Sequence, residues 1–459
     1  MEPDKEYIEL FEQYSPVCID LGPGVMNDLS AEFLLAEETP KWTLQQCIDY
    51  AMEHSPSLER QKLSTNSQTL QTVIEKAAFD WSISASDNYT FASPDNNNSA
   101  TIGLQKDFQN GFKFRTTATG SETEHNDYKS TTVAFQISKQ ILGGGTALET
   151  KYNLKASELD ELISQNTLKR AQRRLILDVT LAYYTIIRAQ QSLTVKQRAL
   201  ENAKQNLLIT KEREKPLDIL TAELRIPNNE LSVNSAKRTI ANGLDSLKEL
   251  IGYDVAKPLD ITGEFTYKVQ TIVPENDLEF ASDNLETIIN NRLEKQKYDM
   301  LVKIREFQKL PDVTLSATHR QHGDGDGYNL DGKDDQVLGV SLNWTIGRNA
   351  DIARYEIAQN NLARNNSEYF TLCQELSANI SSYKRRLDEY ARAVELQELQ
   401  CNLIRRQEEL YRDKWENGEI DILELVRTQT DLENSYVDLS DSKINYLELL
   451  ANYMFLIGK

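Results

Sequence analysis

The residues of this sequence that are best suited to binding a metal ion are aspartates in one short, glycine-rich segment. Carboxylates stand at Asp324, Asp326, Asp331, Asp334 and Asp335. Closely spaced carboxylate oxygens are typical Ca²⁺ ligands, but this spacing misses several ligand positions of an EF-hand loop. We therefore favour an acidic, solvent-exposed loop over a Ca²⁺ site.

The histidines do not add a metal centre to this segment. His319 and His322 lie just before it, whereas His54 and His125 are isolated. Zinc sites use three or four protein ligands, and two histidines alone do not supply them. The sequence also contains no nucleophile–base–acid arrangement and no phosphate-binding loop. We expect no enzymatic activity, no cofactor and no resident metal.

The four cysteines do not indicate a redox site or a metal site. Cys373 and Cys401 fall on one predicted helix, about 28 residues and therefore about 42 Å apart, which is beyond the reach of a disulfide. Cys18 and Cys47 can pair only in an oxidising compartment. No spacing among the four matches a metal-ligand pattern.

Composition and charge exclude several classes of protein. The chain has 51 basic and 71 acidic residues in 459, a net charge of −20. Such a surface repels phosphate, so we expect no nucleic-acid partner. No stretch approaches 18 uncharged apolar residues, which excludes a transmembrane helix but not a barrel of short strands. No signal peptide is visible, so either the protein is cytoplasmic or this chain lacks its native start.

Hydrophobic periodicity divides the first half of the chain into helices and strands. Residues 1–40 have no clear period and are expected to form an irregular arm. A helical pattern begins after Thr43, a predicted N-cap, and breaks at Ser55-Pro56 before continuing to about residue 78. Period-two alternation follows. The predicted strands are 81–91, a hairpin over 100–120 and 131–142, and the predicted long helices are 146–214 and 217–251.

The same order of elements returns in the second half. After a linker over 253–275, short helices are followed by strands at 312–320 and 336–346 and by long helices at 349–415 and 420–457. Short sequences return as well, because LERQK at 58–62 is matched by LEKQK at 293–297, and Asp-Ile-Leu at 218–220 by the same residues at 421–423. We therefore expect an internal duplication, with repeats at 41–252 and 276–458.

These elements constrain the architecture physically. A helix over 146–214 is about 100 Å long, so its apolar residues must be buried laterally against other long helices, as in a coiled coil. The strands carry Ser, Thr, Asn and Gln on one face, which suits a water-filled lumen better than the outer face of a soluble sandwich. The other face is predicted to contact lipid through Trp81, Ile83, Phe135, Ile137, Val340, Leu342, Trp344 and Ile346.

Several stretches, taken in order, resemble one family. They are the strand-to-helix passages at 135–143 and 340–348, the stretch 178–184 in the first long helix, the closing stretch 445–458, and above all 411–432. The last of these contains Trp415, Gly418 and Asp421 around a helix-turn-helix. Across 41–458 the chain resembles the TolC-like outer membrane efflux protein family.

The resemblance implies a fold that is mostly α with a small β part. It implies a homotrimer whose strands close one transmembrane β-barrel in outer-membrane lipid and whose helices form an α-helical barrel extending into the periplasm. The implied function is the exit channel of a tripartite efflux pump or of a type I secretion system, with a periplasmic adaptor (membrane fusion) protein and an inner-membrane transporter as partners. The alternatives are a soluble coiled-coil scaffold and a non-conducting family member.

The resemblance also points to residues at the periplasmic tip. Family members narrow this end with acidic residues, and an ungapped alignment from Gly418 places Glu424 at the first such position and Arg427 at the second. Three copies of Glu424 would form a carboxylate ring that attracts cations. The alternative is a solvated Glu424–Arg427 pair. Asp421 is expected to be a helix N-terminal carboxylate rather than part of a gate.

Contacts with the adaptor are expected at two turns, through Trp415, Gly418, Lys215 and Pro216. Gly418 is predicted to supply a positive φ. Lys215-Pro216 stands where the family has glycine, so the first-half tip is expected to turn differently. The hairpin over 100–120 exceeds the two strands per half of the family's simplest pattern, and two placements stay open: within the barrel, or over its mouth.

Overall fold

The computed structural model describes residues 40–91, 96–123, 128–143, 146–212, 216–262, 265–270, 272–325, 330 and 332–459. The arm expected over 1–40 therefore lies almost entirely outside the described residues. Several residues named above lie outside them as well: Cys18, His125, Lys215, Asp326 and Asp331 are not described, nor is the side chain of Asp324.

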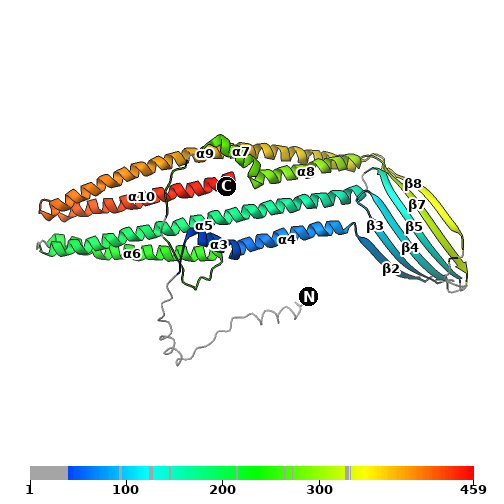
Figure 1. Cartoon of the computed structure of the whole chain (residues 1–459), viewed down its shortest axis with the longest axis horizontal. Helices are drawn as coiled ribbons and strands as arrows, with labels where there is room; N and C mark the ends of the chain where they lie inside the picture. Colours follow the sequence, from blue (N-terminus) through cyan, green and yellow to red (C-terminus); the bar gives the residue numbers. More distant parts are fainter. Residues whose placement is uncertain are drawn as a thin grey trace, which may run out of the picture.

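The described chain is an elongated array of helices with one sheet at its end (Figure 1). The helices are α3 (Leu44–His54), α4 (Pro56–Ala77), α5 (Thr146–Glu212), α6 (Pro216–Ile251), α7 (Pro274–Asn284), α8 (Glu286–Phe307), α9 (Asn349–Glu416) and α10 (Ile422–Ile457). The strands are β1 (Lys41–Trp42), β2 (Trp81–Thr90), β3 (Asn97–Asp107), β4 (Phe112–Thr123), β5 (Tyr128–Leu142), β6 (Asp260–Ile261), β7 (Asp312–Gly325) and β8 (Asp334–Asn343).

Local sequence explains where the first helices begin and end. Thr43 caps α3 with a capping box, because its hydroxyl accepts from the Gln46 backbone N–H while the Gln46 side chain accepts from the Thr43 backbone N–H. Ser55 ends α3, and Pro56 then occupies the first turn of α4, where its missing N–H costs nothing. The predicted break at Ser55-Pro56 is confirmed.

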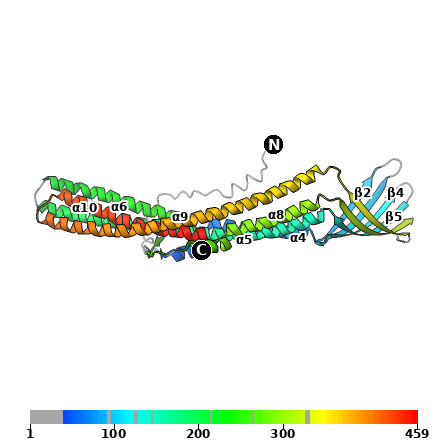
Figure 2. The same cartoon turned by 90° about the horizontal axis from the view of Figure 1, so that it is seen from above.

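The long helices bury their apolar residues against one another, side by side (Figure 2). Helix α5 packs on α4, α6, α8 and α10, and α9 packs on α8 and α10. One core, around Val179, Ile186 and Leu247, joins α3, α5 and α6. A second core, around Ile380 and Tyr453, joins α7, α9 and α10. No described helix has an apolar stretch that is long enough to cross a membrane.

The two halves of the chain contain helices of matching length. Helices α3 and α7 have 11 residues each, and α4 and α8 have 22 each. Helix α5 has 67 residues and α9 has 68, while α6 and α10 have 36 each. Both 36-residue helices end at a glycine with positive φ, at Gly252 and Gly458.

Six strands form one antiparallel sheet in the order β2-β3-β4-β5-β7-β8. The hairpin expected over 100–120 is β3 and β4, and it lies within the sheet between β2 and β5. Its turn contains Gly111, with φ +86°, and is closed by the hydrogen bond from Phe108 N–H to Phe112 C=O. Strand β8 ends at Asn343, so the strand expected over 336–346 is too long at its C-terminal end.

A second, two-stranded sheet was not predicted from the sequence. Lys41–Trp42 pairs in parallel with Asp260–Ile261. The start of the described chain is thereby held against the segment that connects the two halves. Each strand has only two residues, which is too short for period-two alternation to appear in a sequence.

Candidate functional site

The register of the six-stranded sheet separates an apolar face from a polar one. Ile83 lies opposite Leu104, which is opposite Thr116, which is opposite Phe135. Side chains at alternate positions therefore share this face across neighbouring strands. The residues expected to contact lipid that belong to strands all lie on it and are exposed: Trp81, Ile83, Phe135, Ile137, Val340 and Leu342. Trp344 and Ile346 are also exposed, but they lie beyond the end of β8.

The opposite face of the sheet carries hydrogen-bonding side chains. The hydroxyls of Thr101 and Thr119 are 3.0 Å apart across β3 and β4, and those of Ser121 and Ser130 are 2.7 Å apart across β4 and β5. Arg115 donates to the Gln105 side chain at 2.8 Å. Such cross-strand polar pairs are stable in contact with water, so this face can line an aqueous space.

Aromatic residues and lysines meet at the helical end of the apolar face. The rings of Trp81 and Phe114 pack edge to face, with centroids 5.9 Å apart. The Lys106 ammonium lies 5.0 Å from the Trp81 ring, and the Lys139 ammonium lies 4.5 Å from the Phe112 ring. Rings with one apolar and one wet side, next to cations, are typical of a membrane–water boundary.

The far end of the helical array is a tight turn between α9 and α10. Gly418 adopts φ +79°, as predicted. Its N–H donates to Trp415 C=O at 3.0 Å, and the Glu419 N–H donates to Lys414 C=O at 2.9 Å. This pair of hydrogen bonds is a Schellman motif, which satisfies the last carbonyls of α9. Asp421 then occupies the N-cap position of α10, in extended conformation and without a side-chain capping bond.

The tip residues expected from the sequence differ in accessibility. Trp415 is only 2% exposed and packs with Ile422, Leu425 and Ala222. It supports the turn from within, so it cannot itself present a contact surface. Gly418 is exposed at the turn between α9 and α10, and Pro216, the first residue of α6, is exposed as well. Lys215 lies outside the described residues.

Glu424 and Arg427 are both exposed in the first turns of α10. The ion pair between them that the sequence allows does not form: within the described part of the chain, no oppositely charged group lies within 4.0 Å of either side chain. Both side chains are therefore available to solvent near the tip.

A buried polar network lies just behind the tip and was not predicted from the sequence. Asn206 of α5 donates to the Gln429 side chain of α10 at 2.9 Å, and Gln429 donates to Glu408 of α9 at 3.3 Å. Glu408 is 4% exposed and also accepts from Arg412 at 2.6 Å. Three helices are thereby joined by hydrogen bonds at one level. Polar residues at core positions of such helices set their register.

One arginine connects α6 to this network. Arg225 donates to Gln429 of the network at 3.4 Å and to Thr430 at 3.0 Å, and its nearest contact with the Glu433 carboxylate is 4.0 Å. Burial raises the pKa of Glu433, and the Arg225 charge opposes this rise only in part. Burial likewise lowers the pKa of Arg225. The pair holds the α5–α6 hairpin to the α9–α10 hairpin, and it does so through charges that are better hydrated when the hairpins separate.

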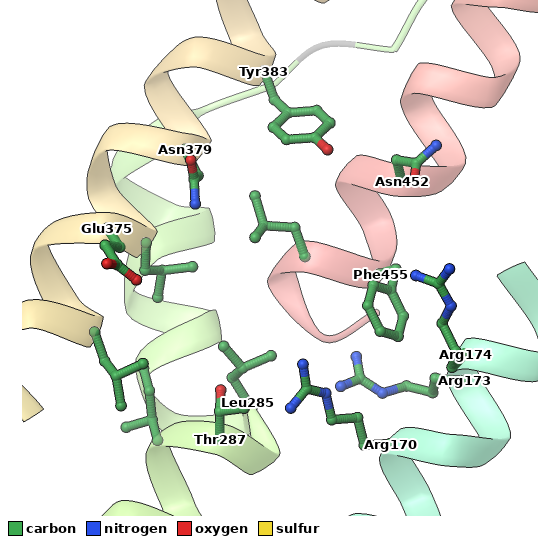
Figure 3. Close-up of a pocket in the computed structure, with 14 residues that line it drawn as sticks. Arg170, Arg173, Arg174, Leu285, Thr287, Glu375, Asn379, Tyr383, Asn452 and Phe455 are labelled. Atoms are coloured by element: carbon green, nitrogen blue, oxygen red, sulfur yellow. The ribbon is translucent and has the colours of Figure 1, made fainter. Parts of the chain in front are cut away.

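Three arginines line an opening of about 380 Å³ farther along the array, between α5, α8, α9 and α10. Arg170, Arg173 and Arg174 extend from α5 toward this opening and Phe455 (Figure 3). Arg173 donates to both carboxylate oxygens of Glu286 on α8, and Arg174 pairs with Asp178 at 3.0 Å. Arg173 therefore ties α5 to α8, whereas the Arg174 pair lies within α5.

The residues first considered for metal binding do not form a centre in the described part of the chain, where no group of three or more potential ligands occurs. His322 contacts Asp335 at 3.3 Å and Thr132 at 3.1 Å. Cys47, Cys373 and Cys401 are free. Burial raises the pKa of Cys47 to about 11, so its thiol stays protonated and unreactive near neutral pH.

Comparison with known proteins identifies the fold. Neither a protein-family model nor a curated protein sequence matches this chain. Similar solved structures include CusC, with a TM-score of 0.69, 12% identity and coverage of 90% of this chain and 92% of that one. The open state of the MtrE outer membrane channel of Neisseria gonorrhoeae matches with a TM-score of 0.66, 15% identity and coverage of 90% and 88%. The Campylobacter jejuni CmeC outer membrane channel matches with a TM-score of 0.65, 15% identity and coverage of 90% and 85%.

The chain thus has the fold of the TolC-like outer membrane efflux channels. The similarity extends over nine-tenths of its length. The fold class expected from the sequence, mostly α with a small β part, is confirmed.

Proposed function

We propose that three copies of this chain form an outer-membrane exit channel, a passive duct that crosses the outer membrane and extends through the periplasm. The sheets join into one β-barrel in lipid, and the helices join into one hollow α-barrel. The observation that carries this proposal is a sheet with one exposed apolar face and one polar face, joined directly to helices about 100 Å long.

Internal duplication gives the duct its wall. Repeats at 41–252 and 276–458, separated by the linker 253–275, supply two similar staves per chain, so three chains form a pseudo-sixfold array. The matching helix lengths of the two halves support this division. Pseudo-equivalent staves allow neighbouring helices to pack alike within a chain and between chains, which a closed helical barrel requires.

The tip carries the gate and the surface that contacts the adaptor. Separation of the α5–α6 and α9–α10 hairpins widens the opening and must break the contacts of Arg225 with Thr430 and Glu433. Three exposed Glu424 carboxylates near the threefold axis favour cations, and Arg427 moderates this preference. The turns at Gly418 and Pro216 are the exposed features that a periplasmic adaptor would contact, with an inner-membrane transporter behind it.

Fractionation of cells that make the full-length precursor tests the location and the assembly. We expect recovery in the outer membrane, release only with detergent, and a trimer by native mass spectrometry. Recovery in the cytosol without detergent would instead establish the soluble coiled-coil scaffold. The experiment uses the full-length precursor because export to the outer membrane requires a targeting sequence.

Conductance in planar lipid bilayers tests the duct itself. We expect cation-preferring current whose preference falls in the Glu424→Gln variant and rises in the matched Arg427→Gln variant. If the trimer inserts in the membrane but carries no current, neither with the adaptor bound nor with a destabilised tip, it is a non-conducting family member. The protein is then co-expressed with an adaptor from a pump operon or with an adaptor from a secretion operon. The adaptor that is isolated together with it distinguishes efflux from type I secretion.

A further inference from the structure

We propose that the transmembrane barrel of the assembled protein has eighteen strands, and that its lumen is therefore wide enough for polypeptide cargo that retains helical structure. This inference rests on the proposed trimeric channel and specifies its membrane segment. It starts from the hairpin β3–β4, which exceeds the two strands per half of the simplest pattern of this fold and which the sequence left unplaced.

The hairpin is a full member of the sheet. Strand β3 pairs with β2 over ten residues of each strand, from Trp81 opposite Lys106 to Thr90 opposite Asn97. Strand β4 pairs with β5 over twelve residues of each, from Phe112 opposite Lys139 to Thr123 opposite Tyr128. With both of its edges paired, the hairpin has no hydrogen-bonding groups left with which to fold over the mouth of a barrel.

The side chains of the hairpin also continue both faces of the sheet. Ile102 and Leu104 lie beside Ala85 and Ile83 on the apolar face. On the polar face Thr101 pairs with Thr119 through their hydroxyls. Ile102 is 62% exposed and lies in line with the apolar residues of the neighbouring strands. An exposed isoleucine at this position is expected if the hairpin contacts lipid, and is not expected if the hairpin lies in water outside the membrane.

The stagger of the strands fits a closed barrel. The hydrogen-bonded row that starts at Trp81, the first residue of β2, reaches Leu338 on β8, about five residues from the strand end at Asn343. Both of these strand ends adjoin helices. The row therefore climbs about 17 Å while it crosses five gaps of about 4.8 Å, an inclination of about 35°. Closed barrels have strand tilts of roughly 35–45°.

The two free edges of the sheet complement each other. An even number of strands leaves β2 and β8 antiparallel, so β8 of one copy can pair with β2 of the next in the same sense as all other pairs. If the stagger continues by one residue per gap, Val340 meets Ala85 of the next copy and Leu342 meets Ile83. This register matches apolar face to apolar face, whereas a slip of one residue would invert it.

Six strands from each of three copies give a wide barrel. Eighteen strands at about 4.8 Å and a tilt of about 35° have a circumference of about 105 Å and a backbone diameter of about 34 Å. Twelve strands at the same tilt give about 22 Å. Roughly 5 Å of side chain on each wall leaves a clear width of about 24 Å, twice the roughly 10–12 Å diameter of an α-helix. Selection by size then falls to the helical tip.

Electron cryomicroscopy of the full-length trimer in lipid nanodiscs tests the strand number directly. We expect a section through the lipid belt to show eighteen strands and a backbone diameter of about 34 Å. Twelve strands, or a diameter of about 22 Å, would overturn the inference and leave the proposed channel intact. Failure to form any membrane trimer would instead overturn the proposed function, and with it this inference.

Cysteine cross-linking gives a second test, in which no strand is deleted. In assembled trimers we expect disulfides in the adjacent pairs Ala85→Cys with Ile102→Cys and Ala118→Cys with Val133→Cys, because cross-strand neighbours have suitable Cβ separations. The matched control, Ala85→Cys with Val133→Cys, joins strands that are separated by the hairpin and should stay reduced. Cross-linking of this control pair would show β2 beside β5 and would overturn the inference.

Polymer exclusion measures the width in bilayers. Polyethylene glycols added on the side of the sheet should enter the native lumen, and lower its current, up to a diameter of about 20 Å, slightly below the clear width of an eighteen-stranded barrel. Deletion of residues 96–123 removes β3 and β4 but keeps β2 and β5 antiparallel with matching faces. We expect this variant, with twelve strands per trimer, to exclude polymers wider than about 10 Å. An identical cut-off for both proteins would overturn the inference.

Discussion

Replacing Arg225 by methionine should loosen the tip of the helical array. The Arg225 side chain is 15% exposed, donates to Gln429 and Thr430, and is 4.0 Å from the Glu433 carboxylate, whose side chain is 23% exposed. Unit charges at that distance attract by about 4 kcal/mol at an effective dielectric constant of about 20. Partial exposure and the cost of burying both charges reduce this, so we estimate a loss of about 2 kcal/mol per copy. Methionine keeps the volume of the apolar stem.

For the proposed channel, the assay is the open probability of single channels in planar bilayers. A loss of about 2 kcal/mol shifts the equilibrium between joined and separated hairpins about 30-fold per copy. We therefore expect Arg225→Met to conduct in long openings where the native protein stays mostly closed. Arg406→Met is the matched control, because Arg406 is exposed on α9 and its loss should leave the open probability unchanged.

A double variant decides whether the charge pair is responsible. The double variant Arg225→Met with Glu433→Gln has no unpaired buried charge at this site. Its open probability should therefore fall at least halfway back from that of Arg225→Met to the native value. If the double variant opens as readily as Arg225→Met alone, or if Arg406→Met opens to the same extent, the reasoning from the buried pair is wrong. Thermal unfolding of each variant checks that the helices remain assembled.

Three further predictions concern the tip and the sheet. Gly418→Ala should cost about 1 kcal/mol in thermal unfolding, because φ is +79° while a Cβ there meets no atom within 4 Å; an unchanged midpoint would contradict this. The pKa of Glu433 is raised above its ordinary 4.5, so the contribution of its proton to tip packing is complete below pH 4.5 and is lost as pH rises through the raised pKa. Open probability should therefore rise with pH over that interval and should be flat in Glu433→Gln. Ile102→Arg, near the middle of the apolar face, should destabilise the membrane-inserted trimer of the proposed channel by about 2–4 kcal/mol, whereas Ser86→Arg on the polar face should not. Equal losses in urea unfolding would refute the assignment of the faces.

Much of the architecture follows from periodicity alone. The change from period two to a helical period marks the ends of the sheet, and the predicted starts of α5 and α9 agree with the structure at residues 146 and 349. Gly418 was predicted correctly because few residue types tolerate a positive φ at a helix C-terminus. Such features are local, so a single sequence contains them.

The contacts that join the tip could not be predicted in this way. Asn206 and Gln429 are 223 residues apart, and Arg225 and Glu433 are on different helices of different halves. Gln429 belongs to the stretch that carries the family resemblance, yet its partners did not follow from the sequence. Trp415 is a second case: the family resemblance points to a contact with the adaptor, but in this structure the side chain packs inside, against Ile422 and Leu425. Long-range pairing depends on the relative rotation of helices, which period alone does not determine.

The sheet has consequences for how the protein becomes stable. In the described chain the outer edges of β2 and β8 have no partner strand, so each monomer offers two edges to which a further strand can be added. In the proposed trimer other copies close those edges, so folding of the sheet follows mass action: its midpoint in denaturant should rise with protein concentration. Until closure, the same edges are templates for aggregation. If the chain forms the proposed channel, a cell that makes it has to keep its monomers dilute or bound to chaperones until the sheets join.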